Sequence, residues 1–140
     1  MGLDNGIILK NYKKHHIPEY IIDLCPFDCK NEKTEELDLC YWRKYWSLRN
    51  EIVQRIHLYK PGDIPDDGNM KLDPEDVDAI RKVLINYLDR KYWEDGHDDC
   101  IWDYDEAKGN ILNSIIILIW LEDYMKLCGE QVEVYFYDSY

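Results

Sequence analysis

The sequence lacks a long apolar run and a regular set of cysteines. Its longest apolar segment, residues 115–121, is far shorter than the roughly 20 residues that a membrane-spanning helix needs. The five cysteines show no repeated spacing, which argues against a disulfide framework. Residues 1–4 have no signal-peptide character. These absences predict a cytoplasmic protein with reduced thiols and no membrane span.

Motifs that mark a reaction are also missing. The chain has no Gly-rich phosphate loop, no nucleophile elbow and no His-Glu-x-x-His pair. Its carboxylates are so numerous that any two of them could be selected as an acid–base pair. The sequence therefore names no catalytic residue and no cofactor. It leaves enzymatic activity open and favours a non-enzymatic role.

Zinc binding is an alternative raised by the first 40 residues. Cys25, Cys29 and Cys40 follow the adjacent His15 and His16. The spacing is irregular, however, and the second cysteine pair of a usual zinc motif is missing. The pattern favours free or buried thiols and predicts no metal site, although it leaves metal binding by these three cysteines open.

The balance of charge is the strongest compositional signal. The chain carries 29 Asp and Glu against 17 Lys and Arg, a formal net charge of −12 at pH 7. Such a chain is repelled by nucleic-acid phosphates and attracted to basic surfaces. With 46% hydrophobic and 14% aromatic residues, it does not resemble a disordered acidic tail. The composition predicts a folded protein that does not bind nucleic acid directly.

Two acidic stretches, residues 63–78 and 94–106, hold seven Asp or Glu each. The first can be aligned with a calcium loop on Gly68, but Pro65 and Pro74 then occupy ligand positions and cannot supply a side-chain oxygen. We expect both stretches to lie on the outside without binding calcium specifically. They form either a solvated surface or a surface that docks on a basic partner, and the second stretch supplies the candidate contacts. Its candidate partner-binding residues are Asp95, Asp98 and Asp99.

Hydrophobic periodicity predicts one α+β domain, residues 1–140, with the order β-α-α-α-β. Residues 11–40 look irregular, except for a possible short helix or strand around residues 20–24. Residues 2–10 are predicted to form a turn and then a strand, and residues 131–137 form the second strand. The predicted helices are 41–57, 74–92 and 105–129. Each lone strand needs a partner for its backbone groups. We therefore expect the N- and C-terminal strands to pair in a small sheet, with the central helix covering it.

Local signals mark the ends of two predicted helices. Asp73 and Pro74 form an N-cap followed by a proline at the first helical position. Gly129 is suited to end the last helix, because glycine accepts the left-handed conformation of a C-terminal cap. Residues 115–121 of that helix are apolar on every side, so we expect them at the centre of the domain.

A charged residue interrupts the apolar face of the helix predicted over residues 41–57. That face consists of Trp42, Tyr45, Trp46, Ile52, Val53 and Ile56, with Arg49 near its centre. A buried guanidinium needs a carboxylate or a bound anion, because an unpaired buried charge is costly. A buried salt bridge is the favoured interpretation. An anion or substrate site, and a side chain that reaches the surface, are the alternatives.

Three segments resemble small uncharacterised proteins of phages, prophages and gut Firmicutes. They are the start Met-Gly-Leu-Asp-Asn-Gly-Ile at 1–7, the block Cys-Tyr-Trp-Arg-Lys-Tyr-Trp-Ser-Leu-Arg-Asn-Glu-Ile at 40–52, and the close Tyr-Asp-Ser-Tyr at 137–140. The resemblance implies a phage-like origin and no particular activity. It selects as candidate binding residues Asp4, Asn5, Tyr41, Trp42, Arg43, Lys44, Arg49 and Asn50.

The leading hypothesis is a non-enzymatic protein-binding module that docks on a basic surface of a host or defence protein. An inhibitor of a nucleic-acid-handling enzyme such as a CRISPR effector would fit this description. The alternative is a small-ligand or nucleotide-binding domain that uses the helix face from Trp42 to Arg49.

Overall fold

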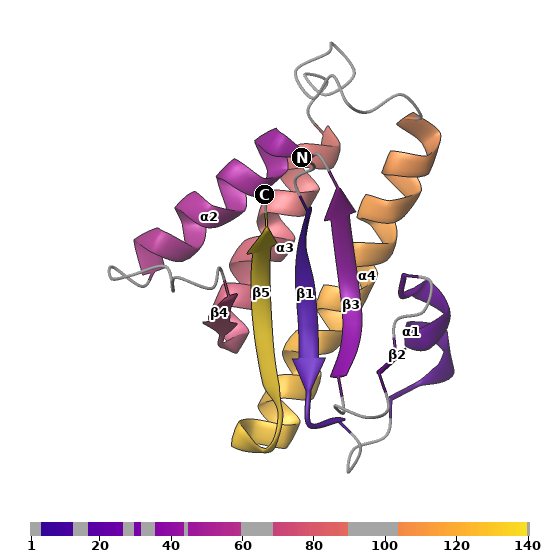
Figure 1. Ribbon diagram of the computed structural model, residues 1–140, viewed down its shortest axis with the longest axis vertical. Helices are drawn as coiled ribbons and strands as arrows, with labels where there is room; N and C mark the ends of the chain where they lie inside the picture. The colour runs from indigo at the N-terminus through magenta and orange to yellow at the C-terminus, as the bar shows by residue number, and fades with distance from the viewer. Residues whose placement is uncertain are drawn as a thin grey trace.

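The computed structural model describes residues 4–12, 17–26, 30–31, 36–43, 45–59, 69–89 and 104–139. The fold is α+β, as predicted (Figure 1). Its elements are β1 (Asp4–Lys10), α1 (Glu19–Leu24), β2 (Lys30–Asn31), β3 (Glu36–Arg43), α2 (Trp46–Tyr59), β4 (Asn69–Leu72), α3 (Pro74–Asp89), α4 (Tyr104–Cys128), the short 3-10 helix η2 (Gly129–Gln131) and β5 (Glu133–Ser139).

The sheet has the strand order β2-β3-β1-β5-β4, and every pair of neighbours is antiparallel. The predicted pairing of the terminal strands is confirmed, because β1 and β5 pair along their full length from Asp4↔Ser139 to Lys10↔Glu133. β1 lies at the centre, so both chain ends meet in the middle of the sheet (Figure 1).

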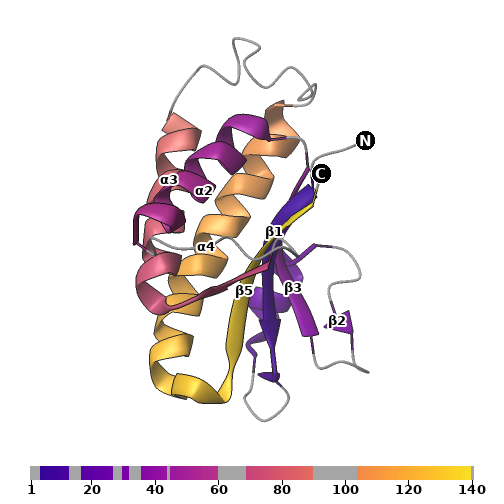
Figure 2. The same cartoon turned by 60° about the vertical axis from the view of Figure 1, so that its left-hand side comes forward.

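Helices α2, α3 and α4 lie together on one side of the sheet (Figure 2). The buried side chains form one core between the sheet and these helices. Its largest fully buried members include Trp42, Tyr87, Ile7, Leu9, Ile21, Leu37, Leu39, Leu48, Ile52 and Ile56. The other face of β1, β3 and β5 is turned toward the viewer in Figure 1, and none of the described helices lies in front of it.

The predicted helix over residues 41–57 is wrong in its first part, because residues 41–43 belong to strand β3 and the helix begins at Trp46. A β-bulge explains the error. The pairing with β1 shifts between Ile7 and Ile8, so Leu39 is an extra residue and both Leu39 and Cys40 are buried. This interrupts the period-two pattern by which a strand is recognised. Trp42 therefore packs in the sheet and does not share a helix face with Arg49.

Three more elements go beyond the predicted order. Residues 20–24, for which a helix or strand was possible, lie in helix α1. The regions predicted to be irregular or loop contain β2, part of β3 and the edge strand β4. β4 has only four residues, and β2 has two. Such short strands carry almost no periodic signal, because they are defined mainly by the neighbour with which they pair.

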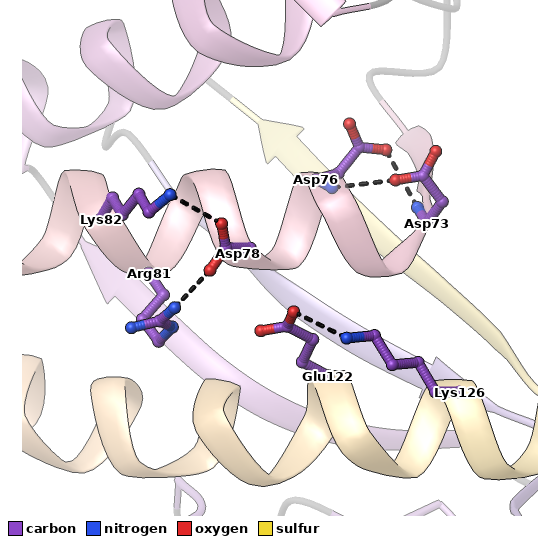
Figure 3. A network of polar contacts seen from close by, with 7 residues as sticks. All are labelled: Asp73, Asp76, Asp78, Arg81, Lys82, Glu122 and Lys126. Carbon is purple, nitrogen blue, oxygen red and sulfur yellow. Dashed lines mark hydrogen bonds and ion pairs between the residues drawn. The ribbon is translucent and has the colours of Figure 1, made fainter.

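The N-terminus of α3 confirms the predicted cap. The backbone N–H of Asp76 donates to Asp73 Oδ1 at 2.9 Å, and the backbone N–H of Asp73 donates to Asp76 Oδ2 at 2.9 Å (Figure 3). This reciprocal pair satisfies two backbone donors that a helix start leaves open. Asp76 is buried, which corrects the expectation that all of residues 63–78 lie outside. Residues 63–68 lie beyond the described residues.

Helix α4 ends at Cys128, and Gly129 follows with a φ of 61°, which confirms the predicted role of this glycine. The expectation that residues 115–121 lie at the centre of the domain is only partly met. Ile117, Leu118 and Leu121 are buried, whereas Ile116 and Ile119 are exposed. The helix packs against α3, α1 and β3, and Ile116 and Ile119 lie on its outer side. None of the helices in the described part of the chain has the length and apolar composition needed to cross a membrane.

Candidate functional site

The sheet face opposite α2, α3 and α4 carries polar and aromatic side chains in rows across β3, β1 and β5. We call it the open face. Successive side chains of a strand point to opposite faces, and the buried Asn5, Ile7 and Leu9 point toward the helices. The pairing therefore groups on the open face Arg43, Asp4, Tyr41, Gly6, Tyr137, Asp38, Ile8, Tyr135, Glu36, Lys10 and Glu133, with Lys71 on β4 beside them.

The cations of the open face each have a carboxylate partner. Lys10 Nζ lies 3.4 Å from Glu36 Oε1, and it also sits over the ring of Tyr135 at 4.9 Å from the centroid. Arg43 Nε lies 3.7 Å from Asp4 Oδ1, and Lys71 Nζ lies 3.9 Å from Glu133 Oε1. These are exposed, long pairs, so each contributes at most about 1 kcal/mol to stability.

Asp38 differs from its neighbours on this face. It is half-buried in the middle of β3, and within the described residues no hydrogen-bond donor or cation contacts its carboxyl group. Burial raises the pKa of Asp38, and the nearby carboxylate of Glu36 raises it further. The folded chain thus keeps a carboxyl group in a position that disfavours its charge.

Tyr137 lies across the centre of the open face because Gly6 has no side chain. A Cβ atom on Gly6 would lie 2.8 Å from the Tyr137 hydroxyl and 2.1 Å from the carbonyl oxygen of Cys40. Burial raises the pKa of Tyr137, and the charge of Asp38 raises it further. Tyr41, in the same row, donates its hydroxyl hydrogen to Asp4 Oδ1 at 2.9 Å.

On the helix side, the salt bridge predicted for Arg49 is confirmed. Arg49 Nε donates to Asp138 Oδ2 at 3.0 Å, and Nη2 donates to the same oxygen at 2.6 Å. Only 16% of the Arg49 side chain and 7% of the Asp138 side chain are exposed. Arg49 Nη1 also donates to Asn50 Oδ1 at 3.0 Å. A guanidinium neutralised in this way does not form a site for an anionic ligand.

Trp42 is fully buried and serves the packing of β3 against α4. Its Nε1–H donates to Ser114 Oγ at 3.0 Å, and Ser114 donates in turn to the carbonyl oxygen of Asn110 at 2.9 Å. Ser114 also hydrogen-bonds the thiol of Cys40. Burial raises the pKa of this thiol to about 12, so Cys40 stays protonated at neutral pH.

Asn5 is a buried amide with no hydrogen-bond partner in the described part of the chain. It lies on the helix side of β1, directly opposite Trp42 on β3 and Asp138 on β5. Its side chain is fully buried, and neither its oxygen nor its nitrogen forms a hydrogen bond with a described residue. An unsatisfied buried amide costs roughly 1–3 kcal/mol, so this position is strained unless another molecule supplies a donor and an acceptor.

The structure brings seven of the sequence-selected residues to one end of the three central strands, but on two faces. Asp4 and Arg43 belong to the open face, where Tyr41 joins them. The remaining four, Asn5, Trp42, Arg49 and Asn50, belong to the helix side or to α2. Lys44, Asp95, Asp98 and Asp99 lie outside the described residues.

Sequence reasoning missed Asp38, Tyr135 and Tyr137 as site residues, and it missed Asp138 as the partner of Arg49. The alternation of Leu37, Asp38 and Leu39 was a signal for the first of them, because it marks a strand with one polar face. No local signal could have paired residues 49 and 138, since their contact depends on the sheet pairing.

Metal ligands are not gathered in the described part of the chain, where no group of three His, Cys, Asp or Glu residues is close enough to hold an ion. Cys25, Cys40 and Cys128 are not joined in disulfides. The other proposed zinc ligands, Cys29, His15 and His16, lie outside the described residues.

Comparison of the chain with known proteins gave no match to a family model, to a curated protein or to a solved structure. The similarity of the two ends and of residues 40–52 to phage and prophage proteins thus stays a prediction. The open face and the buried amide of Asn5 are the two candidate binding features of the described residues.

Proposed function

We propose that the protein is a non-enzymatic binding module that docks a basic surface of another protein on its open face. The observation that carries this proposal is a sheet face without a covering helix among the described elements, where Tyr41, Tyr135 and Tyr137 surround the half-buried carboxyl group of Asp38. A face of an antiparallel sheet usually either packs on the core through apolar side chains or meets solvent with polar ones. The open face instead combines tyrosine rings with charged side chains.

The composition of the open face suits protein recognition. Tyrosine is enriched at interfaces, because its ring buries a large area while its hydroxyl keeps a hydrogen-bond partner. Around the three tyrosines, exposed charged pairs form a polar rim. The net charge of −12 would steer a basic partner toward the protein and repel nucleic acid. The resemblance to phage proteins supports a host or defence protein as that partner.

A salt-dependent pull-down from phage-infected host lysate tests this proposal. The variant with Tyr41→Ser and Tyr135→Ser should lose a partner that the wild type recovers at low salt and releases at high salt. Tyr20→Ser is the matched control, because Tyr20 is exposed on α1, outside the open face. Its recovery of the partner should equal that of the wild type.

Two results would overturn the proposal. One is recovery of the same partner by the double tyrosine variant when its folding, followed by circular dichroism, is intact. The other is direct binding of DNA or RNA by the purified protein, since this would place the function on a basic patch instead of the open face.

A second candidate function, small-ligand binding, is favoured by the unpartnered amide of Asn5. The sequence suggested a ligand site on a helix face from Trp42 to Arg49. That location is wrong, because Trp42 is buried in the sheet. A ligand at Asn5 would carry a neighbouring hydrogen-bond donor and acceptor. Native mass spectrometry tests this: a small molecule retained by the wild type and absent from Asn5→Leu supports it, and a bare wild-type chain argues against it.

A further inference from the structure

We propose that Asp38 is the anchor of the open face and accepts one arginine side chain of the partner, held against the rings of Tyr41 and Tyr137. The inference rests on the proposed function and names the chemical group that the site recognises. Its basis is the position of three side chains on neighbouring strands, together with the distribution of charge around them.

The sheet pairing places these side chains side by side. Tyr41 pairs with Gly6, and Gly6 pairs with Tyr137, so the two tyrosines flank one glycine in the same row. Asp38 pairs with Ile8 in the next row. The Tyr137 hydroxyl lies over Gly6, next to the carbonyl oxygen of Cys40 on β3. Tyr137 therefore leans from β5 toward the strand that carries Asp38.

Charge complementarity selects a cation as the guest. The other carboxylates of the open face, Asp4, Glu36 and Glu133, already contact Arg43, Lys10 and Lys71. Asp38 has no such contact within the described residues. A cation of the partner would bind the oxygens of the Asp38 carboxyl group. This binding would remove the electrostatic cost of keeping the carboxylate half-buried.

The neighbours of Asp38 favour an organic cation over a metal ion. A divalent ion requires several oxygen ligands, and among the described residues no group of three His, Cys, Asp or Glu side chains, at Asp38 or elsewhere, is close enough to hold an ion. A planar guanidinium suits this place better, because it can bond a carboxylate through two N–H groups and stack on aromatic rings. An ammonium group of lysine forms neither the paired bonds nor the stacking contact as well.

Titration with capped tripeptides tests the inference. We would follow the ring resonances of Tyr41 and Tyr137 by NMR while adding Gly-Arg-Gly, Gly-Lys-Gly or Gly-citrulline-Gly. The expected result is saturable shifts with the arginine peptide, weaker binding of the lysine peptide and no shifts with citrulline, which has the same shape without charge. Asp38→Asn should raise the Kd of the arginine peptide by about tenfold or more.

Glu122→Gln is the matched control, because it removes a carboxylate that is paired with Lys126 on α4, away from the open face. Its affinity for the arginine peptide should stay close to that of the wild type. Equal binding of the arginine and citrulline peptides, absence of binding, or equal affinity of Asp38→Asn and the wild type would each overturn the inference.

The failure of this inference and the failure of the proposed function are distinguishable. If the lysate partner is lost with the double tyrosine variant and kept with Asp38→Asn, the open face is the docking surface and Asp38 is not its anchor. If the partner is kept with both variants, the docking surface itself lies elsewhere.

Discussion

Gly6 is a residue at which one added methyl group should strongly lower the stability of the fold. Its Cβ would lie 2.1 Å from the carbonyl oxygen of Cys40, a backbone atom that cannot move without breaking the pairing of β1 and β3. We expect Gly6→Ala to lower the free energy of unfolding by at least about 2 kcal/mol, measured by urea denaturation.

Gly109→Ala is the control for this prediction. A Cβ there meets no atom within 4 Å, and the residue lies inside helix α4. Alanine should raise stability by about 0.5–1 kcal/mol, because it has the higher helix propensity. Equal effects of the two substitutions would contradict the close approach of β1 and β3 at Gly6.

The pair of Arg49 and Asp138 should show strong coupling. Removing one partner leaves a largely buried charge alone, so Arg49→Leu and Asp138→Leu should each destabilise the protein by about 3–5 kcal/mol. The double variant should be much less destabilised than the sum of the two, since an apolar pair can replace a buried ion pair. A double-mutant cycle in urea measures this coupling, and additive effects would show that the two side chains are energetically independent.

Asp38 should make stability depend on pH in a particular direction. Its raised pKa means that the folded state holds the proton more tightly than the unfolded state. The stabilising contribution is complete below the unfolded pKa of about 3.9, and it is lost as the pH rises through the raised folded value. We therefore expect Asp38→Asn to be more stable than the wild type at neutral pH, with a difference that shrinks on acidification.

Thermal unfolding of both proteins between about pH 4 and 7 measures this difference. A wild type as stable as Asp38→Asn at neutral pH would show that Asp38 ionises without cost. A residue kept at a cost to stability is typical of a binding site.

At the scale of the element, the N-terminus of α3 is the most sharply specified part of the chain. The Asp73 carboxylate accepts a hydrogen bond from the backbone N–H of Asp76, and the Asp76 carboxylate accepts one from the backbone N–H of Asp73 (Figure 3). We expect Asp73→Ala to cost about 1 kcal/mol of stability, measured by urea denaturation. Asp123→Ala is the control, because Asp123 is exposed in the interior of α4, and it should change stability by less than about 0.5 kcal/mol.

Elements differ in how far the sequence alone predicts them. Helix α3 has a local start signal in Asp73 and Pro74, and helix α4 has a stop signal in Gly129, so these two helix ends were predictable. Strand β3 was not, because the bulge at Leu39 breaks its alternation. The edge strand β4 was not, because its four residues form a strand only by pairing with β5.

At the scale of the whole molecule, the excess of negative charge should limit stability. With a net charge of −12, the negative side chains repel one another, and this repulsion is stronger in the compact folded state than in the unfolded chain. Added salt shortens the Debye length from about 30 Å at 0.01 M to about 3 Å at 1 M. We expect the Tm to rise with sodium chloride over this range.

Potassium chloride should raise the Tm by the same amount, because screening depends on ionic strength. A Tm that stays constant or falls with salt would mean that favourable ion pairs, such as the bridge of Arg49 and Asp138, outweigh the repulsion.

The amino-acid sequence by itself determined the class of the fold, the pairing need of the terminal strands, the N-terminus of α3, the C-terminus of α4, and the demand of Arg49 for a carboxylate. Each of these follows from local periodicity, from capping chemistry or from the cost of a buried charge. Only the tertiary structure decided that Asp138 is the carboxylate, that Trp42 is enclosed, and that Asp38 shares a face with Tyr41 and Tyr137. These contacts join residues up to about a hundred positions apart, and they depend on strand order and register, which no local pattern encodes.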